Sequence, residues 1–202
     1  MQNGLGQGTE DPVHSSDTPQ LNSGCTAMEL QLTTVPAQQM TARQTADVVV
    51  LCSAVFQVDY AHLLGICPER THVLGYLDGQ LVAHALWLMR QLRIGEAEWF
   101  VVPYIEGVAT HPTHRRQGYG SALMRHLQEA IHSYPFAALS PARADWYLSL
   151  GWERWRGPLS IHRDGTLRAT PGETLLVYRT PHTPDLDLHA PLAGEYRTFS
   201  DW

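Results

Sequence analysis

Residues 108–123 read VATHPTHRRQGYGSAL, the most informative stretch of the chain. An apolar strand ends there, Pro112 stops the strand from continuing, and Gly118 and Gly120 open an amphipathic helix. Glycine lets backbone N–H groups approach a ligand without a Cβ in the way, and a helix N-terminus favours a bound anion. The pattern predicts a phosphate-binding turn, with a plain helix cap as the alternative. A dinucleotide fold is disfavoured, because no GxGxxG follows a first strand.

The segments on both sides of this turn alternate between strand and helix patterns. Asp78-Gly79 is typical of a two-residue hairpin. Segment 57–68 is expected to be a loop, 181–202 an ordered tail or loop, and 1–27 a disordered extension. The order predicts one α+β domain, an α/β sandwich with a mixed sheet, over residues 28–202. Strands are expected at 28–35, 71–77, 81–94, 98–110, 136–140, 159–163 and 174–179, and helices at 41–58, 118–132 and 143–150.

The composition excludes several function classes. The chain has 202 residues and a formal net charge of −6, and all 14 of its basic residues are arginine. Without lysine there is neither a Schiff-base lysine nor a P-loop lysine. The acidic balance argues against nucleic-acid binding and suits a cationic small molecule. No membrane span or signal peptide is visible, so we expect a cytoplasmic protein without a membrane partner.

The cysteines point to ordinary core and loop positions. Cys25, Cys52 and Cys67 are odd in number and form no CxxC pair, so a disulfide framework is not expected. A metal site could be drawn from Cys52, His62, Cys67 and His72, but this spacing matches no closed zinc pattern. We therefore expect no metal.

The run R-x-x-G-x-G within residues 115–120, with its preceding strand and Ser-Ala-Leu helix, resembles the acetyl-CoA-binding motif of the GNAT (Gcn5-related N-acetyltransferase) superfamily. The resemblance implies the GNAT acyl-CoA N-acyltransferase fold and acetyl-CoA as co-substrate. It also implies that the strand hydrogen-bonds the pantetheine arm and that the helix N-terminus holds the pyrophosphate. The implied cofactor-binding residues are Val108, Ala109, Thr110, Arg115, Arg116, Gln117, Gly118, Tyr119, Gly120 and Ser121.

A narrower resemblance concerns residues 104–109 (YIEGVA), 138–143 (ALSPAR), 146–158 (WYLSLGWERWRGP) and the terminal 200–202 (SDW). These stretches are similar to the aminoglycoside 2'-N-acetyltransferases, which implies an antibiotic-resistance enzyme and a homodimer. A GNAT enzyme for another amine or a protein N-terminus, and a non-catalytic acyl-CoA sensor, stay open as alternatives.

The same resemblance implies the catalytic roles. Glu106 would accept the proton of the attacking amine through water, and Tyr147 would protonate the departing thiolate. The backbone N–H of Val108 would polarise the thioester carbonyl. Attack would be direct, without an acyl-enzyme, so no cysteine nucleophile is needed.

The substrate-binding residues implied are Asp59, Gly107, Ser140, Glu173, Asp201 and Trp202 with its α-carboxylate. Carboxylates suit a polycationic aminoglycoside. The chain ends Asp-Trp where the family has Asp-x-Trp, and residues 171–174 offer a single acid. Fewer acids suggest a smaller aminocyclitol antibiotic such as kasugamycin. Residues 111–170 hold eight arginines and four acids, whereas 181–202 hold four acids and one arginine, so a basic cofactor half and an acidic substrate tail are expected.

Overall fold

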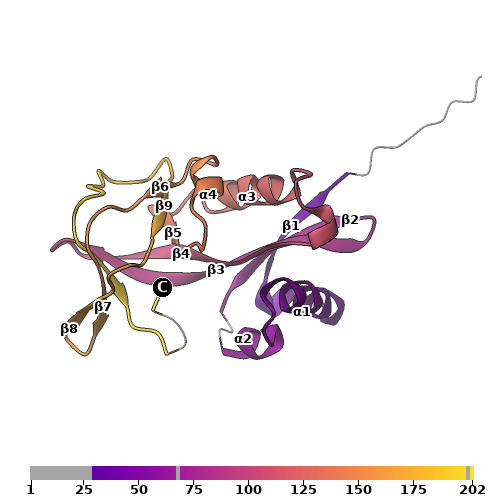
Figure 1. The fold of residues 1–202 in the computed structure, drawn as a ribbon, viewed down its shortest axis with the longest axis horizontal. Coiled ribbons are helices and arrows are strands. Elements are labelled where there is room, and N and C mark those ends of the chain that lie inside the picture. Colours follow the sequence, from indigo (N-terminus) through magenta and orange to yellow (C-terminus); the bar gives the residue numbers. More distant parts are fainter. Residues whose placement is uncertain (1–28, 67–68, 199–200) are drawn as a thin grey trace, which may run out of the picture.

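The computed structural model describes residues 29–66, 69–198 and 201–202. Within these ranges ten strands form one mixed sheet, with α1 and α2 on one face and α3 and α4 on the other (Figure 1). The predicted α/β sandwich is therefore confirmed. The expected disordered extension at 1–27, with Cys25, and the loop residue Cys67 lie outside the described residues.

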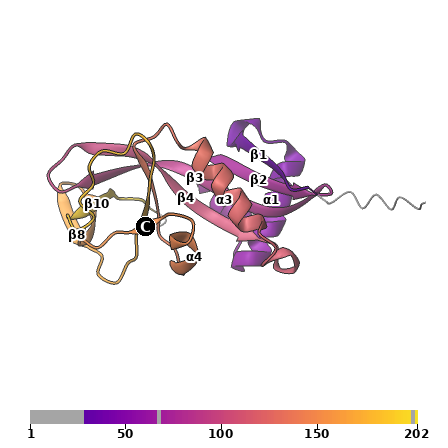
Figure 2. The same cartoon turned by 90° about the horizontal axis from the view of Figure 1, so that it is seen from above.

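The strands occur in the order β6-β9-β5-β4-β3-β10-β7-β8. Strand β2 pairs with the part of β3 that β10 does not reach, and β1 pairs with β2. Figure 2 shows α3 lying across β3 and β4, with β8 and β10 at the far end of an elongated domain from α1. The strands are β1 Gln31–Pro36, β2 Thr71–Leu77, β3 Gln80–Ile94, β4 Trp99–Thr110, β5 Phe136–Leu139, β6 Glu153–Arg154, β7 Leu159–Arg163, β8 Thr166–Ala169, β9 Leu176–Arg179 and β10 Leu192–Glu195, and the helices are α1 Ala42–Phe56, α2 Tyr60–Ile66, α3 Tyr119–Ala130 and α4 Asp145–Leu148.

Strand β3 organises the sheet because it is long enough to pair with two strands on one edge. Its first part pairs with β2 and its last residues pair with β10, while β4 follows the opposite edge from Ala83 to Arg93. The predicted hairpin between β2 and β3 is confirmed, since Asp78 and Gly79 have φ of 49° and 76°. The β10 pairing was not predicted, because it joins parts of the chain that are far apart in sequence.

Helix α2 replaces the loop expected at 57–68, so that prediction is wrong. The carboxylate of Asp59 accepts a hydrogen bond from the backbone N–H of His62 at 3.2 Å, as an N-cap residue does. Tyr60 and Leu64 bury their side chains against α1 and the sheet. Burial of these two side chains stabilises a helix that is too short for its pattern to be visible in the sequence.

Helix α3 begins at the predicted glycines and buries Leu123, Met124 and Leu127. Gln128 is a polar residue that nevertheless lies on the buried face of this helix. Gln128 is 8% exposed, and its Nε2 donates to the carbonyl of Leu150 at 2.9 Å. A buried amide is tolerated there because it satisfies a carbonyl of the turn that follows α4.

No single helix in the described ranges is long and apolar enough to cross a membrane. Together α1 and α2 are long and apolar enough, but they are bent by 115° at the break between them, and both pack against the sheet.

Candidate active site

The centre of the site is a bulge in β4. Leu86 pairs with Glu106 and His84 pairs with Ala109, so Ala85 of β3 faces both Gly107 and Val108. Gly107 has φ of +61°, and a Cβ at this position would collide with the hydroxyl of Tyr60. Only glycine fits this bend, which turns the Gly107–Val108 peptide out of the regular ladder.

Beside the bulge, β4 and β5 separate. Among the described residues, the one ladder pair between these parallel strands joins Tyr104 to Ala138. The rest of β4, from Ile105 to Thr110, runs on without a β5 partner in that ladder. This divergence leaves backbone groups along β4 without a β5 partner, and an extended ligand can hydrogen-bond to them.

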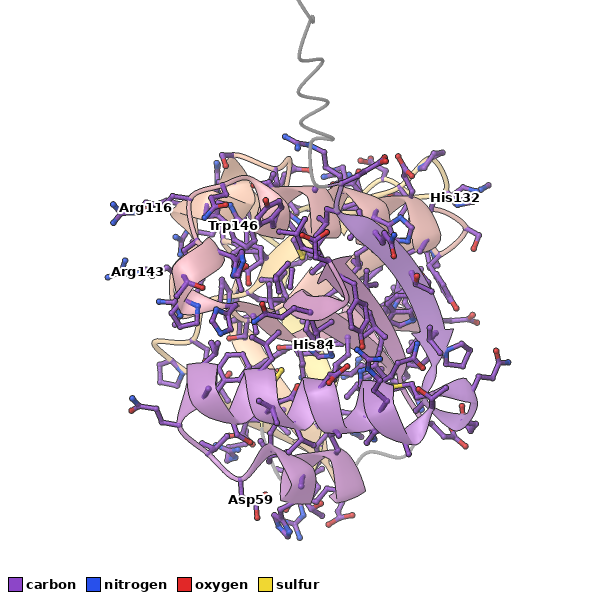
Figure 3. The ribbon with its side chains drawn as sticks, turned by 90° about the vertical axis from the view of Figure 1, so that its right-hand side faces the viewer. Asp59, His84, Arg116, His132, Arg143 and Trp146 are labelled. Carbon is purple, nitrogen blue, oxygen red and sulfur yellow. The ribbon has the colours of Figure 1, made fainter. Side chains whose placement is uncertain are left out.

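A pocket of about 260 Å³ lies where β4 leads into α3. Gly118 caps α3 with φ of +86° and has open space where a Cβ would be. Arg115 and Arg116 are exposed beside it, and Figure 3 shows Arg116 pointing away from the body of the domain. Free N–H groups, the helix dipole and arginine charge together suit a pyrophosphate. The pocket is lined by Thr110, His114, Arg115, Arg116, Gly118, Gly120, Ser121 and Trp146.

Three of the predicted cofactor residues have other surroundings. Ala109 is 2% exposed and packs under α1, so it can offer a ligand only its backbone. Gln117 donates to the carbonyl of Thr113 at 3.1 Å, and Tyr119 packs against the core beside α3. Trp146 was not predicted, but its Nε1 donates to Ser121 Oγ at 3.3 Å and its ring closes one side of the pocket.

The carboxylate of Glu106 forms an ion pair with a residue of the C-terminal segment. Its Oε1 accepts a hydrogen bond from Nη1 of Arg197 at 2.7 Å. The guanidinium of Arg197 also lies over the ring of Tyr104, 5.1 Å from the ring centroid. Glu106 is thus a partnered, partly exposed acid.

A second pocket, of about 300 Å³, opens between α1, α2 and β4, with Glu106 and Gly107 on its wall. Most of its lining is apolar, and Glu106 is the one acid among the lining residues. An amine in this pocket would lie beside the carboxylate and the bulge. The lining residues are Phe56, Val58, Tyr60, Leu63, Leu64, Ile66, Arg70, Leu86, Leu88, Glu106 and Gly107.

Tyr147 stands on α4, on the opposite face of the sheet from α2. Its ring lies 4.8 Å from that of Trp146 and 6.3 Å from that of Trp152, and it packs against the same core cluster as Val108. Burial raises the pKa of Tyr147 to about 12. The phenol therefore carries its proton at neutral pH and can donate it.

The predicted substrate residues are spread over several elements. Asp59 caps α2 and lies in Figure 3 at the opposite end of the molecule from Trp146. Ser140 directly follows β5, and Glu173 is exposed in the turn before β9. Asp201 pairs with Arg168, and the Nε1 of Trp202 donates to Thr170 Oγ1 at 2.8 Å. Of the six, only Gly107 lines the pocket beside Glu106.

Sequence reasoning missed the arginines that hold the C-terminal segment. Arg90 of β3 is fully buried, its guanidinium lies 4.8 Å from the ring of Trp202, and it donates to the carbonyl of Asp201. Burial lowers the pKa of Arg90 to about 10. Two signals were present in the sequence: Arg90 interrupts an apolar run, and Arg197 is the single base of an acidic tail.

Among the described residues, no group of three His, Cys, Asp or Glu side chains is arranged to hold a metal ion.

Comparison with known proteins agrees with this geometry. A family model described as an acetyltransferase (GNAT) domain matches residues 36–155. An aminoglycoside 2'-N-acetyltransferase of Mycolicibacterium fortuitum is 29% identical over 151 residues, which cover 71% of this chain and 75% of that protein.

Solved structures give the same fold. The GNAT family N-acetyltransferase YhbS of Escherichia coli, solved in complex with CoA, matches with a TM-score of 0.57 and 15% identity over 85% of this chain and 91% of its own. A GCN5-related N-acetyltransferase of Kribbella flavida matches with a TM-score of 0.54 and 26% identity over 64% of this chain, and the match spans 35% of that longer protein. Because the family model covers more than half of the chain, this protein belongs to the GNAT family of acetyl-CoA-dependent N-acetyltransferases.

Proposed function

We propose that this enzyme acetylates the 2'-amino group of an aminoglycoside-type antibiotic with acetyl-CoA and thereby confers resistance. The observation that carries the proposal is the position of Glu106, which is next to the β4 bulge and on the wall of a pocket of about 300 Å³. At this position the carboxylate can contact the amine of the substrate, next to the β4 backbone that can hydrogen-bond the thioester. The 2'-amino specificity rests on the Mycolicibacterium relative and the sequence motifs.

The chain's own groups can account for each proton in a direct transfer. The neutral amine attacks the acetyl carbonyl, the C–N bond forms, and the C–S bond breaks. Glu106 takes the amine proton through water, the N–H of Val108 stabilises the oxyanion, and Tyr147 gives its proton to the thiolate. Solvent then restores both side chains to their starting protonation states.

The cofactor would lie along β4 with its pyrophosphate at the start of α3. The open space over Gly118 and the exposed arginines fit an anionic group. Thr110 and Ser121 offer hydroxyls in the same pocket. We propose that acetyl-CoA is held by these residues and needs no metal.

A smaller antibiotic of the kasugamycin type remains our proposal for the substrate. The pocket beside the base has a single acid in its lining, and Asp201 is already paired with Arg168. A substrate with several ammonium groups would leave some of them without a carboxylate partner in this pocket, whereas a substrate with a single reactive amine would not. We also propose that Asp59, Ser140, Glu173 and the C-terminal Trp202 contact the substrate. A homodimer and a cytoplasmic location are proposed as well.

The apolar lining favours a second candidate substrate. Phe56, Val58, Leu63 and Leu88 surround the space in front of Glu106. Such a surface would bind the aliphatic or aromatic body of a simple amine by burial of apolar area. The protein would then be a GNAT enzyme for a hydrophobic small amine.

One assay distinguishes these candidates. Thiol release from acetyl-CoA is measured with gentamicin, tobramycin, kasugamycin, spermidine and phenylethylamine, and products are located by NMR. Highest kcat/KM with kasugamycin supports the smaller antibiotic, and equal or better turnover of gentamicin or tobramycin contradicts it. Preference for phenylethylamine selects the second candidate. Acetyl-CoA binding without turnover of any amine would favour a sensor module.

A further inference from the structure

A line of hydrogen bonds runs from the partly buried Arg70 through two buried histidines to the β4 bulge beneath α1. The Nε of Arg70 lies 3.0 Å from Nε2 of His72, and Nδ1 of His72 lies 2.9 Å from Nε2 of His84. Nδ1 of His84 lies 2.8 Å from the carbonyl oxygen of Gly107. Both histidines are fully buried, and Figure 3 shows His84 in the interior of the domain next to α1.

The hydrogen bonds in this line all point the same way. A guanidinium can only donate, so Nε2 of His72 accepts and carries no proton. Burial lowers the pKa of His72 to about 3 and that of His84 to about 4, so both rings are neutral at pH 7. His72 therefore has its proton on Nδ1 and donates to His84. His84 then has its own proton on Nδ1 and donates to Gly107.

The acceptor at the end of the line belongs to a peptide unit with a second role. The carbonyl of Gly107 and the N–H of Val108 are the two ends of one peptide bond. A donor on the carbonyl draws electron density from the nitrogen, which makes the N–H a stronger donor, and successive hydrogen bonds reinforce one another. The Val108 N–H is the group proposed above to stabilise the oxyanion.

The surroundings hold this peptide in one orientation. The Tyr60 hydroxyl lies directly over Gly107, and the φ of +61° at Gly107 fixes the bend. Sγ of Cys52 lies 3.3 Å from Nδ1 of His84, further away than the carbonyl at 2.8 Å. The neutral oxygen at the shorter distance is the better acceptor, so the donated proton is directed to Gly107.

We propose that His84, oriented by His72 and Arg70, is a positioning residue that fixes and polarises the Gly107–Val108 peptide for the thioester carbonyl. His84 does not touch the substrate and acts through the backbone. The inference rests on the proposed role of the Val108 N–H. It gives a function to two buried histidines that the transfer steps themselves do not use.

Two isosteric variants test the proposal. In His84→Asn the amide nitrogen can take the place of Nδ1 and donate to Gly107. In His84→Leu the side chain is about the size of asparagine but has no hydrogen-bond donor. The readout is the infrared carbonyl stretch of acetyl-CoA labelled with ¹³C in the thioester carbonyl, bound to each variant. We expect the band to move back toward its position in free acetyl-CoA in the leucine variant only, with kcat about tenfold lower at little change in acetyl-CoA KM.

The same measurement separates this inference from the proposed function, because the bound cofactor can be observed without any amine. A wild-type band that is not shifted on binding would contradict the role of the Val108 N–H. A wild-type band that is shifted, and shifted equally in a leucine variant that still binds acetyl-CoA, would overturn the role of His84 alone. In Glu106→Gln the shifted band should persist although turnover is lost.

If the leucine variant does not fold, the wild-type protein still decides the matter. Nitrogen NMR of the histidine rings at pH 7 should show the proton of His84 on Nδ1, with a hydrogen-bond coupling to the carbonyl carbon of Gly107. A proton on Nε2, a charged ring, or no coupling would overturn the proposal.

Discussion

Nη1 of Arg197 lies 2.7 Å from Oε1 of Glu106, although the two residues are 91 positions apart in the chain. The side chain of Arg197 is 7% exposed and that of Glu106 is 31% exposed. The C-terminal segment therefore fixes the carboxylate at the wall of the pocket that would take the amine. It also places a guanidinium in direct contact with the carboxylate proposed to accept the amine proton.

The ion pair predicts that Arg197→Met weakens both catalysis and folding. The carboxylate loses its anchor, so kcat should fall by about tenfold. The free energy of unfolding should fall by about 1–2 kcal/mol, at the lower end for a broken ion pair because solvent reaches Glu106. Arg197→Lys keeps the charge without the planar fork and should show a smaller loss of both. Steady-state kinetics and urea unfolding measure the two effects, and an unchanged kcat in the methionine variant would show that the pairing does not serve catalysis.

Two exposed arginines allow a matched test of the cofactor pocket. Arg116 lines the pocket at the start of α3, and Arg143 points outward from the same edge in Figure 3 without lining it. Arg116→Gln should raise the KM for acetyl-CoA about five- to tenfold, because a charge beside the pyrophosphate is lost. Arg143→Gln should change it less than twofold. Equal effects would indicate general attraction of the anion and not a local contact.

If Tyr147 is the general acid, Tyr147→Phe should lose activity without losing stability. The ring packing against Trp152 is kept, so stability should change by less than about 0.5 kcal/mol. Turnover should fall by about tenfold to a hundredfold, because no group protonates the thiolate. Since the pKa of Tyr147 is about 12, the wild-type pH profile should show no fall due to this phenol below about pH 11. Full activity in the phenylalanine variant would remove Tyr147 from the mechanism.

The buried histidines predict that stability falls in acid. Both have pKa values in the folded protein, about 3 for His72 and about 4 for His84, below the usual 6.5. Between pH 6.5 and about 4 the unfolded chain therefore binds more protons, and each histidine should cost up to about 1.4 kcal/mol per pH unit as pH falls. Their contribution is complete above pH 6.5.

Urea unfolding at pH 7 and pH 5 measures this loss. His84→Asn should reduce the difference between the two pH values, because one titrating group is gone. His132→Asn, at a surface position in Figure 3, should leave the difference unchanged. Equal stability at both pH values in the wild type would contradict the burial of neutral rings.

Local patterns made part of this molecule predictable. Asp78-Gly79 and the R-x-x-G-x-G run each specify a turn within a few residues, and both turns occur where the sequence predicts them. Glu106 and Tyr147 were likewise chosen from motifs that are continuous in sequence, and their catalytic roles stay predictions.

Contacts between distant segments were not predictable. Three such contacts depend on the position of β3 between β4 on one edge and β2 and β10 on the other. They are the pairing of β10 with β3, the Arg197–Glu106 ion pair and the His72–His84 contact. Helix α2 was missed for a different reason, since its seven residues are too few to show a helical period, and burial of Tyr60 and Leu64 decides its structure.

In the proposed mechanism Glu106 accepts the proton of the attacking amine, and its amide variant tests this step directly. Thiol release at pH 7 with saturating acetyl-CoA is measured for wild type, Glu106→Gln and Glu129→Gln, the last changing an exposed acid on α3. We predict that Glu106→Gln loses at least about a hundredfold in kcat while its acetyl-CoA affinity stays within about threefold, and that Glu129→Gln behaves as wild type. Turnover by Glu106→Gln equal to that of wild type would show that Glu106 is not the base.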